Sequence, residues 1–447
     1  MVHLVFVRTG EESTNILENE GEDEAAEIVG YLNAFFFSGE DTEGEAPEVE
    51  CPPKKDLSSY VTGMNISLAI CPFFVIFVTY NLPAIRQRHM KFDPNRPYDL
   101  PLLPPALNFK HEQFVDVMLK TRTELGELNG YSYSLPNPLL LLSPAVIKES
   151  VASSNIENIN TTMEEALQAQ LFPEAEQKKP DKEVLRYRDA IMWGFENLKK
   201  IPISTRLILG IHKKLMPDQS PDYRKTQNRI ANSATGAVIY TPPPANELPQ
   251  LLNNWEQFVN KDDDGIDPLV KAAIAHCQFE AIHPFGDGNG RTGRILMVLQ
   301  LIQLELLSLP ILYVSGYINK NRNEYYRLLQ AVRTDEGWHD FIFYMLKGFH
   351  QQARETKITL LKVMELLEKT RKHLKEKHRK IYSAELVEAM FALPIITPVN
   401  LGKKLDVNYR TASRYLVELA KGNVLKESYV GKYHLYANKP LLKLLKT

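Results

Sequence analysis

The segment "HPFGDGNGRTGR", residues 283 to 294, holds one histidine, one aspartate, four glycines, one asparagine and two arginines. The residues before it, "KAAIAHCQFEAI", have a helical composition, and those after it, "RILMVLQLIQL", are typical of a second helix. Twelve residues between two helices therefore combine a group that titrates near neutral pH, a carboxylate, a flexible backbone and two fixed positive charges.

The glycine spacing in this segment has a familiar alternative interpretation. Gly288, Gly290 and Gly293 match the G-x-G-x-x-G spacing of dinucleotide-binding folds. That fingerprint needs a preceding strand and an acidic residue about 20 positions later. The preceding residues lack a β-branched run, and no Lys-Ser or Lys-Thr pair follows as in a P-loop. The spacing does not indicate either fold.

The same residues predict a site for an anion. The backbone of residues 286–290 can turn several N–H groups toward one point at the start of a helix, where the dipole favours negative charge. Arg291 and Arg294 lie three apart and share a helix face, which suits a di- or triphosphate. Asp287 would repel phosphates unless a divalent cation lay between them. His283 is then the candidate general base.

The segment resembles the signature of Fic-domain proteins, H-P-F-x-[D/E]-G-N-G-R-x-x-R, and meets every fixed position. The resemblance extends over most of residues 90–447. It implies a mainly α fold, with a Fic helical core, a small β-hairpin flap and a C-terminal winged helix-turn-helix domain. Most Fic proteins transfer AMP from ATP to a Ser, Thr or Tyr hydroxyl of a target protein, and some transfer UMP, phosphocholine or phosphate.

The resemblance also implies roles for single residues. His283 would deprotonate the target hydroxyl, and Asp287 would hold Mg²⁺ (or Mn²⁺) against the phosphates of ATP. Phe285 is expected to pack under the loop. The nucleotide would be held by Gly286, Gly288, Asn289, Gly290, Arg291 and Arg294.

A β-prone stretch, "TGAVIYTPPP", precedes this motif at residues 235–244. By resemblance it is the flap that docks the target backbone by strand addition. The residues assigned to this flap are Gly236, Ala237, Val238, Ile239 and Tyr240.

A second motif indicates autoinhibition. Fic proteins that inhibit themselves carry [S/T]-x-x-x-E-[G/N], and "SSNIEN" supplies Ser153, Glu157 and Asn158. Glu157 would pair with Arg294 and draw it away from the γ-phosphate. In a branch of the family the same glutamate also supports removal of AMP, which is an open alternative for this chain.

Charge is distributed unevenly along the chain. Residues 1–60 hold 15 acidic and 3 basic residues, whereas residues 371–447 hold 16 basic and 6 acidic ones. Within the basic end, helix, turn, helix and two short strands are expected. Lys403, Lys404, Arg410 and Arg414 near the second helix permit DNA contact, with a protein-docking module as the alternative.

Residues 1–89 are expected to be an acidic tail plus an apolar segment outside the core. Membrane anchoring through residues 61–85 is the less favoured alternative, because asparagines and a proline interrupt a short apolar run. Three widely spaced cysteines suit a reducing compartment, so a cytoplasmic location is expected.

The sequence therefore predicts four segments: residues 1–89; an N-terminal Fic-associated region with the inhibitory helix (90–180); the catalytic core (181–370); and the winged helix domain (371–447). The predicted function is an autoinhibited protein adenylyltransferase that modifies a target protein and itself. The alternatives are a Fic enzyme that transfers another group such as UMP, and a DNA-binding regulator that senses a nucleotide without turnover. Pairing into a homodimer is a further expectation from the resemblance.

Overall fold

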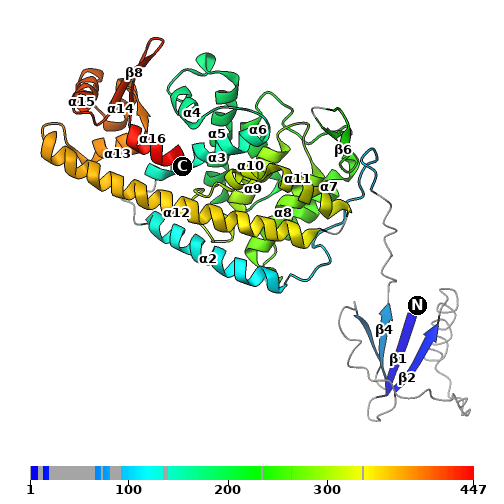
Figure 1. Ribbon diagram of the computed structural model, residues 1–447. Helices are drawn as coiled ribbons and strands as arrows, with labels where there is room; N and C mark the ends of the chain where they lie inside the picture. Colours follow the sequence, from blue (N-terminus) through cyan, green and yellow to red (C-terminus); the bar gives the residue numbers. More distant parts are fainter. Residues whose placement is uncertain are drawn as a thin grey trace, which may run out of the picture. The chain divides into compact units, whose positions relative to one another are not determined.

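The structure is a computed structural model that describes residues 2–8, 14–19, 66–71, 74–80, 92–109, 111–133, 139–232, 235–262, 264–334 and 337–446. The chain divides into two compact units, Met1–Lys91 and Phe92–Thr447. The larger unit is mainly helical, as predicted, with two small antiparallel strand groups (Figure 1). The division of residues 90–447 into three segments stays a prediction.

The smaller unit contains a four-stranded antiparallel sheet in the order β2-β1-β4-β3, although the sequence predicted no core for residues 1–89. Its strands are β1 (Val2–Arg8), β2 (Thr14–Asn19), β3 (Ile66–Cys71) and β4 (Phe74–Tyr80). The apolar run lies largely in β3 and β4, which pair with each other. Parts of the acidic segment of residues 1–60 form β1 and β2, and residues 20–65 lie outside the described residues. Among those described, no helix has the length and apolar character to cross a membrane.

The larger unit is built around two adjacent buried helices. Every residue of α8 from Leu269 to Ile282 is buried, and so is most of α9. Small side chains in "KAAIAHC" allow other helices to approach α8 closely on all sides. The Asp267 side chain accepts a hydrogen bond from the Leu269 N–H and caps α8, with Pro268 in the first turn.

The elements of this core are α8, α9 and those that surround them. They are α5 (Lys179–Leu198), α6 (Thr205–Leu215), η3 (Ala245–Glu247), α7 (Leu248–Asn260), α8 (Pro268–Ile282), α9 (Asn289–Gln303), α10 (Val314–Lys320) and α11 (Arg322–Thr334). They are preceded by α2 (Glu112–Tyr133), α3 (Leu139–Ile156), α4 (Met163–Ala169) and η2 (Glu174–Glu176).

A single long helix joins the core to the C-terminal end. Helix α12 (Trp338–Lys377) has 40 residues, which corresponds to about 60 Å at 1.5 Å per residue. Helix α2 lies alongside part of it (Figure 1). No glycine or proline interrupts residues 349–377, so the boundary expected at residue 370 falls inside a continuous helix.

The C-terminal end combines short helices with a three-stranded sheet in the order β7-β9-β8. Asn408 caps the third helix of this module by accepting a hydrogen bond from the Thr411 N–H, so the helix begins at Tyr409. Gly422 ends it. The elements are α13 (Ala384–Ala392), β7 (Ile395–Ile396), α14 (Pro398–Leu405), α15 (Tyr409–Lys421), β8 (Lys426–Val430), β9 (Tyr433–Ala437) and α16 (Lys439–Lys446).

Candidate active site

The motif forms the connection between α8 and α9, and two residues with positive φ shape it. His283 ends α8 with φ 50° and ψ 58°, so the chain leaves the helix axis at this residue. Gly288 has φ 81° and directly precedes the first residue of α9. A side chain at Gly288 would be strained, and its Cβ would lie 2.9 Å from Met216 Cγ. The glycine therefore permits both the turn and the close packing.

Asn289 holds this loop closed from within. Its Oδ1 accepts a hydrogen bond from the Phe285 N–H at 2.8 Å, and its Nδ2 donates to the Phe285 carbonyl at 2.9 Å. The side chain is buried. The resemblance assigned Asn289 to nucleotide binding, and the structure gives its amide this loop-closing pair of contacts.

Phe285 is completely buried, and the His212 ring stacks on it with a centroid separation of 3.7 Å. His212 Nε2 lies 3.0 Å from the Asp287 carbonyl oxygen, to which it can only donate. Burial lowers the pKa of His212. A neutral His212 therefore supports the loop from α6, a role that no motif in the sequence indicated.

His283 lies half-buried at the entrance of the loop. Burial lowers the pKa of His283 to about 4, although the Glu280 carbonyl, 3.4 Å from Nδ1, acts in the opposite direction. The imidazole is therefore neutral at pH 7. With its proton on Nδ1 facing that carbonyl, Nε2 retains a lone pair that can accept a proton.

Arg224 is a positioning residue that the sequence analysis did not single out. Its Nε donates to the His283 carbonyl at 3.0 Å, and its backbone N–H donates to the Pro284 carbonyl at 2.9 Å. A further guanidinium nitrogen bonds the Pro243 carbonyl, next to the flap. Arg224 therefore ties the turn at His283 to the flap. It lies 59 residues before His283, with no motif around it.

Arg291 points toward the loop from the first turn of α9. Its Nη1 donates to Glu183 Oε2 at 3.0 Å, and its Nη2 lies 3.7 Å from Asp287 Oδ1. The side chain is buried, whereas that of Asp287 is 60% exposed. The two acids hold the guanidinium beside the backbone of residues 286–290.

Asp287 is the residue that fits a divalent cation. Its exposed carboxylate stands beside the loop whose glycines precede α9. Mg²⁺ is usually held by one or two carboxylates together with substrate phosphates, and one carboxylate at a phosphate site meets that pattern. In the part of the chain that the structure describes, no group of three or more acidic, His or Cys side chains could hold a metal by itself.

Arg294 is buried and bound by the residues of the predicted inhibitory motif. Its Nη2 donates to Glu157 Oε1 at 2.7 Å, and its Nε donates to Ser153 Oγ at 2.8 Å. Nη2 also bonds the Ser153 carbonyl at 3.1 Å. Burial alone would raise the pKa of Glu157, but the Arg294 guanidinium, with Arg291 and Arg322, brings it below its usual value. The carboxylate is therefore ionised in this contact.

Two local features allow Glu157 to reach Arg294. Asn158 has φ 61° and ends the turn that follows α3, where the Ile159 N–H bonds the Ser154 carbonyl. This left-handed position suits Asn or Gly. A Cβ on Gly290 would lie 2.5 Å from Glu157 Oε1, so a side chain at position 290 would displace the carboxylate from the place it has beside the loop.

The flap is a two-stranded antiparallel hairpin of β5 (Ile230–Ala231) and β6 (Val238–Tyr240). Gly236 takes φ 71° in its turn, next to Ala237, and the Ile239 side chain is exposed. Tyr240 instead is fully buried and donates to the Ala281 carbonyl at 2.8 Å. Tyr240 therefore anchors the flap to α8, while Ile239 faces outward.

Family models match most of the larger unit. Residues 202–301 match the model of the Fic/DOC family, residues 115–196 match that of the Fic/DOC family N-terminal region, and residues 366–441 match that of the C-terminal domain of SoFic-like protein adenylyltransferases.

The chain is also similar to curated proteins and to solved structures. A protein adenylyltransferase Fic of Drosophila grimshawi is 28% identical over 31% of this chain and 27% of its own length. A probable protein adenylyltransferase of Aquifex aeolicus (strain VF5) is 33% identical over 28% of this chain and 38% of its own. The crystal structure of a Fic family protein from Desulfovibrio desulfuricans G20 is 21% identical, with a TM-score of 0.46, over 75% of this chain and 98% of that one. The chain thus spans well under half the length of these curated relatives.

Proposed function

Because the chain belongs to the Fic/DOC family, we propose that it is a protein adenylyltransferase that transfers AMP from ATP to a side-chain hydroxyl of a target protein. The observation that carries the proposal is a neutral histidine, His283, at the entrance of a loop that leads into α9. Arg291 and Arg294 lie on the first turns of the same helix. The similarity to protein adenylyltransferases supports the same reaction.

The proposed chemistry is one in-line displacement. His283 Nε2 takes the proton of the target hydroxyl, whose oxygen forms a bond to the α-phosphorus of ATP. The bond from that phosphorus to the bridging oxygen breaks, and pyrophosphate leaves. The backbone N–H groups of residues 286–290 and the Arg291 guanidinium bind the phosphates, so catalysis rests on positioning and electrostatics.

Mg²⁺, held by Asp287 together with phosphate oxygens, would offset the negative charge that develops on the leaving group. The hydrogen bond between Asp287 Oδ1 and the Gly288 N–H at 2.6 Å orients this carboxylate beside the loop. The free edge of β6 would receive the target backbone, because β5 pairs with the other edge of β6 in this two-stranded sheet.

The proposed resting state is inhibited. Two nitrogens of the Arg294 guanidinium donate hydrogen bonds to Ser153 and Glu157, and the side chain is buried. A γ-phosphate that approached Arg294 would have to displace an ionised carboxylate at 2.7 Å. ATP would then bind without the arginine that sets its productive pose.

The test is transfer of AMP from α-labelled ATP with Mg²⁺ to protein. We expect strong labelling of the Glu157→Gly variant, weak labelling of the wild type and none of the variant that combines Glu157→Gly with His283→Ala. The absence of label in every variant, with ATP binding intact, would contradict adenylyl transfer. Label from UTP rather than ATP would assign the enzyme to another transferred group.

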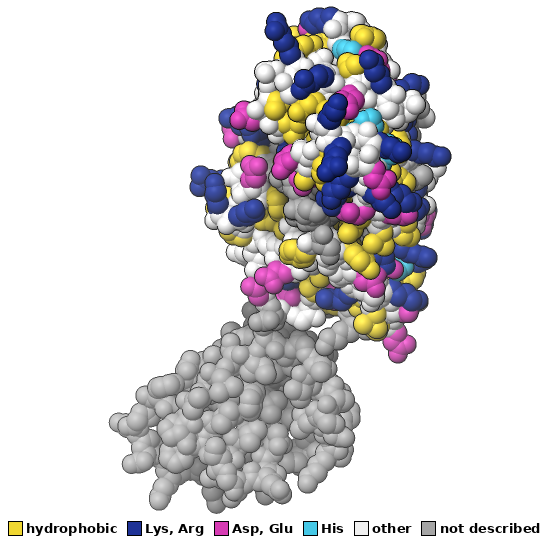
Figure 2. All heavy atoms as spheres, turned by 90° about the vertical axis from the view of Figure 1, so that its left-hand side faces the viewer, with side chains coloured by type: hydrophobic (Ala, Val, Ile, Leu, Met, Phe, Trp, Pro, Cys, Tyr) yellow, Lys and Arg dark blue, Asp and Glu magenta, His cyan; other side chains and the backbone are white. Residues whose placement is uncertain are grey.

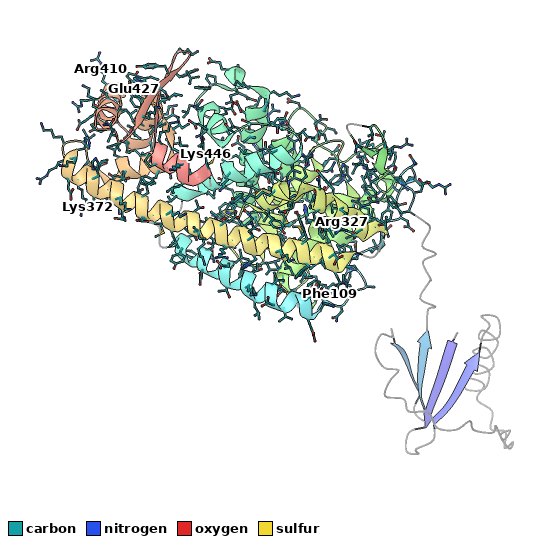
Figure 3. All side chains as sticks on the ribbon, viewed as in Figure 1. Phe109, Arg327, Lys372, Arg410, Glu427 and Lys446 are labelled. Atoms are coloured by element: carbon teal, nitrogen blue, oxygen red, sulfur yellow. The ribbon has the colours of Figure 1, made fainter. Side chains whose placement is uncertain are left out.

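A second candidate function, contact with DNA, is favoured by the outer face of α15. Lys and Arg side chains are spread over this end of the unit (Figure 2), and Arg410 lies at its outer edge (Figure 3). Arg410 and Arg414 are exposed beside a hollow of about 520 Å³ on α15. In a winged helix module, this helix would enter the major groove. Salt-dependent DNA binding that Arg410→Gln and Arg414→Gln weaken would support it, and unchanged binding would not.

A further inference from the structure

A hollow of about 770 Å³ lies behind the inhibitory helix. Its walls come from α3, α4, α10 and the last residues of α16, so elements from three parts of the chain meet around it. Lys446, at the end of α16, marks its C-terminal wall (Figure 3). None of the catalytic residues described above lines this hollow.

Helix α3 presents opposite faces to the hollow and to the active site. Ser153 and Glu157, four residues apart, face Arg294. At 100° per residue, the positions of α3 that line the hollow share the other face. These positions are Lys148, Val151, Ala152 and Asn155. Whatever fills the hollow therefore contacts the same rigid helix that carries the inhibitory glutamate.

The polar groups in the hollow are incompletely paired. Among the described residues, no carboxylate lies within ion-pairing distance of Lys148, whose Nζ sits 4.4 Å from the centre of the Tyr313 ring. Asn155 Oδ1 is buried without a hydrogen-bond partner there. Burial, and to a smaller degree the like charge of Lys320, lower the pKa of Lys148 to about 8, while Glu355 opposes the change. Among the described residues, the Lys148 ammonium thus has no direct ion-pair partner.

The remaining charges around the hollow are largely engaged. Lys320 Nζ lies 3.5 Å from Glu355 Oε2, and Lys446 Nζ lies 2.7 Å from Glu164 Oε2. Glu165 bonds the cap of α4. A ligand in the hollow could therefore supply a negative charge to the Lys148 ammonium and a hydrogen-bond donor to Asn155 Oδ1. The lining lysines act as point charges, which suit phosphate, and the lining contains no arginine fork for a carboxylate.

We propose that the hollow binds a small hydroxylated phosphate ester, with the phosphate at Lys148 and a ligand hydroxyl donating to Asn155, and that its occupancy holds α3 in the inhibiting position. The proposed inhibition rests on the proposed adenylyltransferase function, whereas the proposed binding of the phosphate ester does not. A ligand that binds the conformation with Glu157 on Arg294 shifts the population toward it. The ligand is therefore an inhibitor.

Binding is tested on the full chain by calorimetric titration with sn-glycerol 3-phosphate, with inorganic phosphate and glycerol as separate arms. We expect saturable binding of the ester that Lys148→Gln weakens by at least about tenfold, the loss of one charge-assisted contact. Asn155→Asp, which adds a repelling carboxylate, should weaken it too. Lys347→Gln is the matched control, since that lysine also lies over an aromatic ring, at 4.1 Å from Phe343.

The active-site loop is a competing phosphate site, so Arg291→Gln separates the two. Binding lost in Arg291→Gln and retained in Lys148→Gln would overturn the proposal. Equal affinity for inorganic phosphate and for the ester would contradict the claim that the ligand carries a hydroxyl group. Binding of glycerol alone would contradict the claim that the ligand must be an anion. If binding holds, the ester should lower AMP labelling of the wild type and leave Glu157→Gly unaffected. Failure of adenylyl transfer leaves the calorimetric result standing, so the two failures are distinguishable.

Discussion

At the residue scale, Glu280 is a buried carboxyl group near the site. It lies one helical turn before His283 on α8, is 9% exposed, and its Oε1 has no hydrogen-bond partner among the described residues. Burial raises the pKa of Glu280 to about 7, with Arg294 opposing and Glu157 adding to the shift. The folded chain thus keeps this proton at pH values where the unfolded chain has lost it.

This shift predicts a pH-dependent effect of Glu280→Gln. Since the folded state binds more protons between pH 4.5 and 7, the free energy of unfolding of the wild type falls as pH rises through that window. The amide cannot ionise, so the variant escapes this loss. We expect equal stability near pH 4 and an advantage of about 1–3 kcal/mol for the variant at pH 8.

Urea unfolding at the two pH values measures this difference. Exposed Glu196 on α5 gives the matched control, because Glu196→Gln removes a carboxylate without a buried environment. A difference between wild type and Glu280→Gln that is the same at both pH values would refute the explanation.

The motif residues could be predicted from the sequence because all of them lie within twelve consecutive positions. Asp287, Arg291 and Arg294 gather at one helix start, and Glu157 meets Arg294 as the second motif indicated. The residues that brace the loop could not be predicted. Arg224 and His212 lie 59 and 75 residues from their backbone partners, and only the packing of α6 and the flap brings them to the loop.

At the element scale, the end of α3 decides where Glu157 lies. Asn158 holds φ at 61°, and its Oδ1 accepts from Arg322 Nη1 at 2.9 Å. A β-carbon without a polar group makes this left-handed position unfavourable by about 1 kcal/mol relative to glycine. The turn after α3 therefore depends on the residue at position 158.

Asn158→Ala and Asn158→Gly form a matched pair that tests this turn. We expect Asn158→Ala to lower the free energy of unfolding by about 1 kcal/mol and to raise AMP labelling, because Glu157 leaves Arg294 more readily. Asn158→Gly should keep both values near those of the wild type. Arg322→Ala controls for the lost side-chain hydrogen bond. Equal behaviour of the alanine and glycine variants would remove the left-handed turn as the cause.

Helices and strands were predictable where the same pattern of apolar residues continues over the whole element. The helices before and after the motif were indicated by the apolar residues of their sequences, because packing fixes both the pattern and the fold. The apolar run of residues 61–85 did not indicate its own secondary structure, because a short apolar stretch suits a helix or a strand, and parts of it form β3 and β4. The boundary expected at residue 370 falls inside α12, because charged residues continue this helix to Lys377.

At the scale of the whole molecule, the C-terminal module reaches back to the inhibitory region. Helix α16 packs on α12 and α3, and Lys439 and Lys446 both bind Glu164, each at 2.7 Å. These two lysines lower the pKa of Glu164. No pattern in the sequence predicts this docking, because each side of it is an ordinary amphipathic surface until the fold brings the two together.

Two effects hold α16 in place, and their magnitudes decide between them. The ion pairs join lysines that are 46% and 54% exposed, so each contributes at most about 1 kcal/mol. The apolar face buries Leu441, Leu442 and Leu445. Truncation of one such leucine costs about 2–5 kcal/mol. Burial of the apolar face therefore stabilises the docking of α16 more than the ion pairs do.

We accordingly expect Leu442→Ala to lower the free energy of unfolding by about 2–4 kcal/mol, and the double variant Lys439→Gln, Lys446→Gln to lower it by less than about 1 kcal/mol. High salt should remove most of the second effect and leave the first, because solvent screens exposed charges but not apolar contacts. Urea unfolding of the full chain at low and high salt measures both. A double lysine variant that is destabilised as strongly as Leu442→Ala would show that the charges on Glu164, rather than the leucines, fasten the end of the chain to the helix that carries Glu157.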